Sequence, residues 1–200
     1  MDCRIEYADS AGVDVISSSL GYFAFDADEL SYEQAALDGK TAMISQAAHL
    51  AADKGILVFC SAGNEGSGDW EKITFPSDAA GIFTVGAIDE DKKKSGFSSI
   101  GFTIDGRVKP DAVALGTSSC VIGPNGSVRY ANGTSFATPI LAGMGVCLWQ
   151  SLPWLNNREM IELLHRSSSQ YKHPDTELGY GIPDFYKAYK KERKNGKRAK

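Results

Sequence analysis

The sequence lacks the marks of several large protein classes. Its 200 residues contain no apolar run near the ~18 residues that a membrane helix requires, and no apolar signal segment follows Met1. The four cysteines include no CxxC pair and have no histidine at ligand spacing, so a zinc site is not expected. A framework of disulfides is not expected at this length either. These absences argue against a membrane-spanning protein and against a small domain stabilised by a metal ion.

Positive charge is scarce outside the C-terminal end. Residues 190–200 hold seven of the 21 Lys and Arg side chains and one of the 25 acidic ones, which gives them a charge of +6 and residues 1–189 a charge of −10. An acidic body lacks the basic surface that nucleic acids require, so no nucleic-acid partner is expected. We expect residues 1–189 to form one domain and the basic segment 190–200 to be a disordered, solvated tail.

What is present indicates an ordinary globular α/β domain. Hydrophobic residues make up 42% of the chain and charged residues 23%. Strand and helix patterns alternate, which favours a largely parallel sheet. The predicted strands are Val13–Leu20, Ile56–Ala62, Phe83–Ile88 and Val113–Leu115, and the predicted helices are Thr41–Lys54, Ser135–Gln150, Asn157–Arg166 and Asp184–Tyr189. Because Ser135–Gln150 is apolar nearly all round, it is expected to be a central, buried helix.

The segment Gly133–Pro139 carries the most chemistry. Ser135 stands between a glycine-containing turn and the start of the apolar helix, where free backbone N–H groups and the positive helix end suit a developing oxyanion. Pro139 is expected in about the first helical turn, where a missing N–H has little effect. The alternative is that Thr134 or Ser135 only caps the helix, and this segment alone does not decide between the two.

A second segment, Ser61–Gly66, ends the predicted strand Ile56–Ala62. In parallel sheets, sites form at the carboxyl ends of strands, which also singles out Ser19–Gly21. The Asn64 side-chain amide is flanked by glycines and well placed to donate to a substrate oxygen. The alternative role is that of an asparagine in a left-handed turn.

These segments, in this order, resemble the subtilisin-like serine peptidases, or subtilases, in which a Gly-Thr-Ser motif carries the nucleophile and an Ala-Gly-Asn loop carries the oxyanion-hole amide. Three further segments agree with the same family: Gly12–Gly21, Phe97–Ser99 followed by Lys109–Ala114, and Gly179–Asp184. The resemblance covers residues 5–189. It implies a three-layer α/β fold whose largely parallel sheet has helices on both faces and lacks its N-terminal strands.

The resemblance also implies a serine endopeptidase that forms an acyl-enzyme on Ser135. Asn64 and the Ser135 backbone N–H would bind the tetrahedral oxyanion. The residues implied to bind substrate are Ser19, Leu20 and Gly21, by strand addition, and Ala62 and Gly63, which would leave room for an apolar substrate side chain. No cofactor is implied; a structural calcium ion stays open, although no dense carboxylate loop indicates one. The family favours a secreted or periplasmic location for the intact protein.

The chain departs from the family pattern on its N-terminal side. In subtilases the acid and the base of the triad precede the substrate strand, in the order Asp, His, Ser, and here no histidine precedes it. His49, His165 and His173 are interpreted as structural or solvated. We therefore expect the C-terminal part of a catalytic domain, inactive alone because the triad Asp and His are missing, and prone to self-association through an exposed strand edge. The alternative is a non-catalytic, subtilase-like peptide-binding domain.

Overall fold

The computed structural model describes residues 2–196, whose centre is a four-stranded sheet. The strands lie in the order β1-β2-β3-β6, with β1 at Val15–Ser18, β2 at Leu57–Ser61, β3 at Phe83–Ile88 and β6 at Ala112–Leu115. All three pairings are parallel. Each strand lies within its predicted range or starts one residue before it, and the predicted parallel sheet is confirmed.

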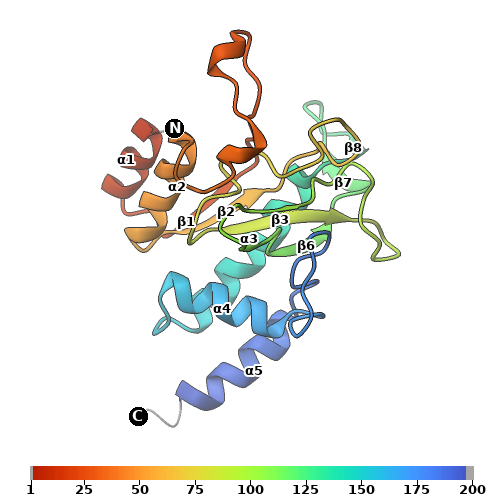
Figure 1. Cartoon of the computed structure of the whole chain (residues 1–200). Coiled ribbons are helices and arrows are strands. Elements are labelled where there is room, and N and C mark those ends of the chain that lie inside the picture. The colour runs from red at the N-terminus through yellow and green to blue at the C-terminus, as the bar shows by residue number, and fades with distance from the viewer. Residues whose placement is uncertain (1, 197–200) are drawn as a thin grey trace.

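Helices cover both faces of this sheet (Figure 1). They are α1 at Asp2–Ser10, α2 at Met43–Asp53, α3 at Thr134–Ser151, α4 at Asn157–Ser167 and α5 at Phe185–Gly196. Successive side chains of a strand point to opposite faces, so Leu57 and Phe59 of β2 pack in one core with α3 and α4, whereas Val58 and Cys60 pack with α2. The three-layer α/β fold is confirmed.

Helix α3 is buried on one face only. That face approaches the sheet closely at Gly145, where a Cβ would lie 2.6 Å from the Phe59 ring. The opposite face is apolar yet open to solvent, with Ile140, Met144 and Val146 exposed by 43%, 45% and 43%. The predicted central helix thus packs on the sheet as expected, but it is buried on that face only.

The C-terminal segment also differs from its prediction. Helix α5 continues to Gly196, so residues 190–196 are helical rather than disordered, and residues 197–200 lie outside the described part of the chain. The Lys190 ammonium lies 4.2 Å from the ring centroid of Tyr186, and the Arg193 guanidinium lies 5.8 Å from that of Tyr189. A spacing of four residues places each cation over an aromatic ring of the preceding turn, which stabilises the end of the helix.

Several short elements carry no clear pattern in the sequence. They are the antiparallel pairs β4 (Gly101–Phe102) with β5 (Val108–Lys109) and β7 (Ser119–Ile122) with β8 (Val128–Ala131), and the 3-10 turns η1 (Asp28–Leu30) and η2 (Gln34–Ala36). Strands β7 and β8 are largely exposed, so they lack the alternation that marks a half-buried strand. The two turns belong to the long orange-red loop that projects away from the sheet in Figure 1.

Candidate active site

Segments that are far apart in the sequence meet at the N-terminus of α3. Ser19, which follows β1, donates its hydroxyl to the backbone carbonyl of Ser135 at 3.0 Å. Asn64, which follows β2, accepts the backbone N–H of Thr134 at 2.9 Å. The structure thus brings the predicted site residues Ser19, Asn64 and Ser135 together at the carboxyl ends of two parallel strands, where ligands bind in open α/β sheets.

Asn64 is held by one end of its side chain. Its Oδ1 accepts hydrogen bonds from the backbone N–H and the hydroxyl of Thr134, at 2.9 and 3.0 Å. Because a backbone N–H can only donate, the oxygen end of the amide faces Thr134, and Nδ2 has no hydrogen-bond partner among the described residues. The left-handed φ in this loop, 108°, belongs to Gly63, so the interpretation of Asn64 as a left-handed turn residue is wrong. The amide nitrogen stays available to a ligand.

The helix begins after Gly133, whose φ of 154° and ψ of 148° suit a residue without a Cβ. A Cβ at this position would make only ordinary contacts, 3.5 Å from the Phe136 ring and 3.7 Å from Asn64 Nδ2, so it is the backbone conformation that favours glycine here. The N-cap residue is Gly133, so the alternative that Thr134 or Ser135 serves only as an N-cap is wrong. The free N–H of Thr134 is satisfied by Asn64 Oδ1.

Pro139 has a more specific effect than its prediction assigned to it. It is the sixth residue of α3 and thus lies in the second helical turn, not the first. A proline has no N–H, so it cannot donate to the carbonyl of Ser135 four residues earlier. That carbonyl instead accepts the Ser19 hydroxyl. Because the proline leaves this carbonyl without a helical donor, the carbonyl can accept the hydrogen bond that joins the start of α3 to the segment after β1.

The Ser135 side chain is half-buried, and its hydroxyl has no hydrogen-bond partner among residues 2–196. The histidines are engaged elsewhere. His49 contacts the carbonyl of Ala80 at 3.0 Å, and His165 contacts the Asp111 carboxylate at 2.9 Å. His173 is exposed in the loop after α4. None of the three bonds to Ser135, so the described residues supply no base for it.

The two segments assigned to substrate binding flank this site. Ser19, Leu20 and Gly21 are exposed and continue beyond β1, which is an edge strand of the sheet. In the described part of the chain no backbone hydrogen bond engages the N–H of Leu20 or Gly21, so both can pair with an added strand. Ala62 and Gly63, in contrast, are buried, and the N–H of Ala62 donates to the carbonyl of Val85 at 2.9 Å.

Lys109, Asp111 and His165 form a buried ionic cluster that the sequence analysis did not predict. There, Lys109 and Asp111 were noted only as part of a family motif. Lys109 Nζ lies 2.6 Å from Asp111 Oδ2, His165 Nε2 lies 2.9 Å from Oδ1, and the N–H of Thr84 donates to Oδ2 at 2.6 Å. Burial alone would raise the pKa of Asp111, but Lys109 and His165 outweigh it and lower that pKa to about 2. Through Asp111, the cluster joins Thr84 of β3 and Lys109 of β5 to His165 of α4, and we expect it to stabilise the fold.

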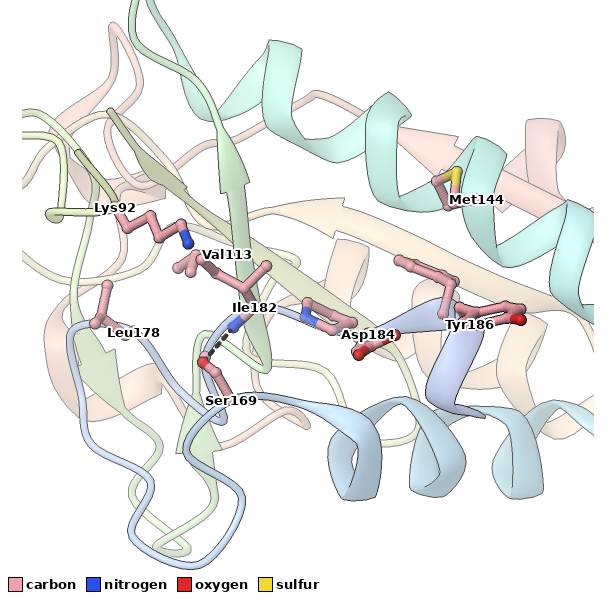
Figure 2. Close-up of a pocket in the computed structure, with 11 residues that line it drawn as sticks. Lys92, Val113, Met144, Ser169, Leu178, Ile182, Asp184 and Tyr186 are labelled. Atoms are coloured by element: carbon pink, nitrogen blue, oxygen red, sulfur yellow. Dashed lines mark hydrogen bonds between the residues drawn. The ribbon is translucent and has the colours of Figure 1, made fainter. Parts of the chain in front are cut away.

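A separate cleft lies at the other edge of the sheet (Figure 2). Val113 of β6, Met144 of α3 and Tyr186 of α5 line it together with Lys92 and Ser169. The Ser169 hydroxyl accepts the N–H of Ile182 at 3.0 Å. Neither Ser135 nor Asn64 borders this cleft, so it is distinct from the site described above.

Comparison with known proteins agrees with this geometry. The model of the subtilase family matches residues 3–181. The chain belongs to the subtilase family. It is 33% identical over 166 residues to subtilisin DY of Bacillus licheniformis, with 82% of this chain and 53% of that protein covered. It is also 33% identical over 190 residues to the serine protease AprX of Bacillus subtilis (strain 168), with 84% and 40% covered. This subtilase chain thus spans about half the length of the curated relatives it matches.

Solved structures support the subtilase fold. The prenylagaramide maturation protease PagA matches with a TM-score of 0.74 at 24% identity, over 94% of this chain and 65% of PagA. The S218A mutant of the protease domain of PatA matches with a TM-score of 0.75 at 22% identity, over 96% of this chain and 64% of that domain. At these identities the likeness concerns the fold.

Proposed function

We propose that this chain carries the nucleophile and the oxyanion hole of a subtilisin-type serine endopeptidase. One observation supports this most: the Asn64 amide is anchored through Oδ1 to Thr134, the first residue of α3 and the sequence neighbour of Ser135, and its Nδ2 has no hydrogen-bond partner among the described residues. An anchored donor needs no reorganisation when negative charge develops, and this is the condition under which an oxyanion hole is most effective.

In the proposed reaction, Ser135 Oγ forms a bond to the carbonyl carbon of a peptide and its proton passes to a histidine base outside these 200 residues. Asn64 Nδ2 and the Ser135 backbone N–H donate to the oxyanion. The carbon–nitrogen bond then breaks, the base returns the proton to the leaving amine, and an acyl-enzyme ester remains on Ser135. Water, deprotonated by the same base, hydrolyses the ester and restores the serine.

Ser19, Leu20 and Gly21 are proposed to hold the substrate as an added strand, with Ala62 and Gly63 beside the side chain that precedes the cut. Support comes from the exposed edge of β1 and from the unpaired N–H groups of Leu20 and Gly21. A peptide paired here would run past the Ser135 carbonyl, to which the Ser19 hydroxyl is bonded. Extended binding is the usual consequence of an open sheet edge.

A second candidate function is a non-catalytic peptide-binding domain of the same family. It is favoured by one observation, the absence of a hydrogen-bond partner for the Ser135 hydroxyl within residues 2–196. The DNA upstream of the Met1 codon distinguishes the two functions: Asp and His motifs of the family there favour the peptidase, and their absence favours the binding domain.

Peptide hydrolysis by the full-length gene product tests the proposal. A mixture of unstructured peptides is expected to be cleaved, and Ser135→Ala is expected to abolish cleavage while leaving the melting temperature unchanged. Met43→Ala is a matched control, because Met43 is exposed by 65% at the start of α2 and lies outside the proposed site. Undiminished cleavage by the Ser135→Ala variant would contradict the assignment of the nucleophile.

The proposed reaction requires no cofactor. We propose that the intact protein is a secreted or periplasmic enzyme, because its relatives include subtilisins. In the described part of the chain, no helix is long and apolar enough to cross a membrane. Among the same residues, no group of three or more His, Cys, Asp or Glu side chains is placed to hold a metal ion.

A further inference from the structure

A positively charged cleft of about 470 Å³ lies between the end of α4 and the start of α5, two helices that contact each other (Figure 1). Its lining consists of Arg166, Lys172, His173 and Lys187 together with the uncharged polar residues 168–171. No Asp or Glu of the described residues lines it, and no residue of the proposed active site borders it. The cleft is therefore a separate hollow in which positive charge is concentrated.

The acidic residues that lie near this cleft in the sequence are engaged with other groups. Glu162 pairs with Nε of Arg166 at 3.2 Å, and the terminal nitrogens of that guanidinium form no hydrogen bond within the described residues. Asp175 accepts two backbone N–H groups of its own loop, and Asp184 accepts the backbone N–H of Lys187 at 2.8 Å. Apart from the pair with Glu162, the cations of the cleft form no ion pair in the described part of the chain.

Helix α5 continues the positive charge beyond the cleft. Four lysines stand at spacings of three, four and seven residues, which places them on one face of the helix: Lys187, Lys190, Lys191 and Lys194. All four are exposed, whereas Ala188 packs in the core on the opposite face. Because this segment is helical, their backbone positions follow one line about 10 Å long. We call these four residues the lysine face.

The shape and the chemistry of this region favour a chain of phosphate groups as the ligand. A hollow admits a group that can enter it, whereas a flat bilayer contacts only projecting side chains. Three permanent cations at one hollow suit a terminal phosphate, which carries up to two negative charges and several acceptor oxygens. Nucleobases bind to free aromatic faces, but Lys190 and Arg193 already cover the rings of Tyr186 and Tyr189.

We propose that the cleft binds the terminal phosphate of an oligophosphate chain and that the lysine face binds the phosphates that follow. The terminal nitrogens of Arg166 donate to two oxygens of the terminal group, and Lys172 and Lys187 supply point charges beside it. The singly charged internal phosphates then lie along α5. This binding site goes beyond the proposed peptidase function and does not depend on it.

Calorimetric titration of the full-length gene product with inorganic tripolyphosphate, without divalent cations, tests the proposal. Tripolyphosphate is expected to bind more tightly than orthophosphate, because the longer chain also reaches the lysine face. Arg166→Gln/Lys187→Gln is expected to weaken the binding of both ligands by ~10-fold or more, the usual scale for a lost hydrogen bond to a charged group. Lys190→Gln/Lys194→Gln is expected to weaken the binding of tripolyphosphate only.

Lys54→Gln/Lys93→Gln is the matched control, since it removes the same charge from side chains that are 62% and 77% exposed outside this region. It should bind tripolyphosphate like the wild type. Circular dichroism checks the fold of each variant, and Lys172→Gln replaces the cleft variant if that variant does not fold. No binding of tripolyphosphate, equal weakening in the control and the cleft variant, or binding to phosphatidylglycerol vesicles but not to tripolyphosphate would overturn the proposal.

Discussion

At the scale of the residue, the two ends of the Asn64 amide differ in their contacts. The oxygen is bound to Thr134 and sets the orientation, whereas the nitrogen has no hydrogen-bond partner among the described residues and is the proposed donor to the substrate. The same logic applies to Ser135, whose carbonyl is bound to Ser19 while its hydroxyl is unengaged. Both residues are fixed through atoms that take no part in the proposed chemistry, so the reacting atoms are positioned without being occupied.

The free nitrogen of Asn64 predicts a selective kinetic defect. In the full-length enzyme, Asn64→Ala is expected to lower kcat by ~10²–10³ with little change in KM, because the amide acts on the transition state. This magnitude is the one known for subtilisin itself, a member of the same family. Steady-state kinetics on one peptide substrate measures it, and a change confined to KM would show that Asn64 only shapes the turn.

At the scale of the element, the sheet is joined to the helices by close packing on one side of α3 and by the ionic cluster around Asp111. Gly145 allows the first contact, since its missing side chain admits the Phe59 ring. Lys109 supplies the second by pairing with a carboxylate that has almost no access to water and that also bonds to His165. Both contacts lie away from Ser135, so they are predicted to affect stability and not the chemistry.

Two glycines of the same helix provide a matched pair. Gly145→Ala is expected to lower the free energy of unfolding by ~1–3 kcal/mol, because the new Cβ would lie 2.6 Å from the Phe59 ring. Gly143→Ala is expected to raise it by up to ~1 kcal/mol, because a Cβ there meets nothing within 4 Å and alanine favours the helix. Urea unfolding compares them, and equal effects of the two substitutions would contradict the packing described for α3.

The cluster around Asp111 predicts how stability depends on pH. Its pKa is lowered from 3.8 to about 2, so the unfolded chain binds this proton more readily than the folded one. The stabilisation from Asp111 is therefore complete above about pH 4 and is lost as the pH falls toward 2. Asp111→Asn is expected to lower the free energy of unfolding at pH 7 by ~3 kcal/mol or more, because Lys109 stays buried without its partner.

Asp91→Asn is the control for this prediction, since Asp91 forms an exposed pair with Lys93 that contributes little to stability. Urea unfolding between pH 2 and pH 7 is the measurement. An Asp111→Asn variant that matches the wild type at pH 7 would show that the cluster does not hold the layers together.

At the scale of the whole molecule, the sequence predicted those features that depend on local pattern. The apolar runs of β2 and β3 gave the parallel sheet, and the Asn156–Glu159 capping box begins α4 where it was expected. The exposure of one face of α3 was not predicted, because it depends on which distant segments lie nearby. The hydrogen bond of Asn64 to Thr134 spans 70 residues and was not predicted either, since the family resemblance implied only that Asn64 acts together with Ser135.

The open surfaces of the molecule predict self-association. Strand β1 forms an edge of the sheet, and α3 exposes Ile140, Met144 and Val146 on one face. Apolar helix faces and open strand edges favour association with other chains. Sedimentation velocity on the 200-residue chain is expected to show dimers or larger species at micromolar concentration, and Met144→Lys is expected to reduce them. A monomer over that whole range would contradict this prediction.

The central claim is that Ser135 is a nucleophile whose base lies outside these 200 residues. Labelling by a fluorophosphonate probe, located by mass spectrometry, tests it most directly on the full-length gene product and on the 200-residue chain. We predict a label on Ser135 in the full-length product and none in the chain alone, because an unassisted serine hydroxyl is a weak nucleophile at neutral pH. An unlabelled Ser135 in the full-length product would contradict its role, and a label on the chain alone that disappears in Ser135→Ala would place the base within the chain.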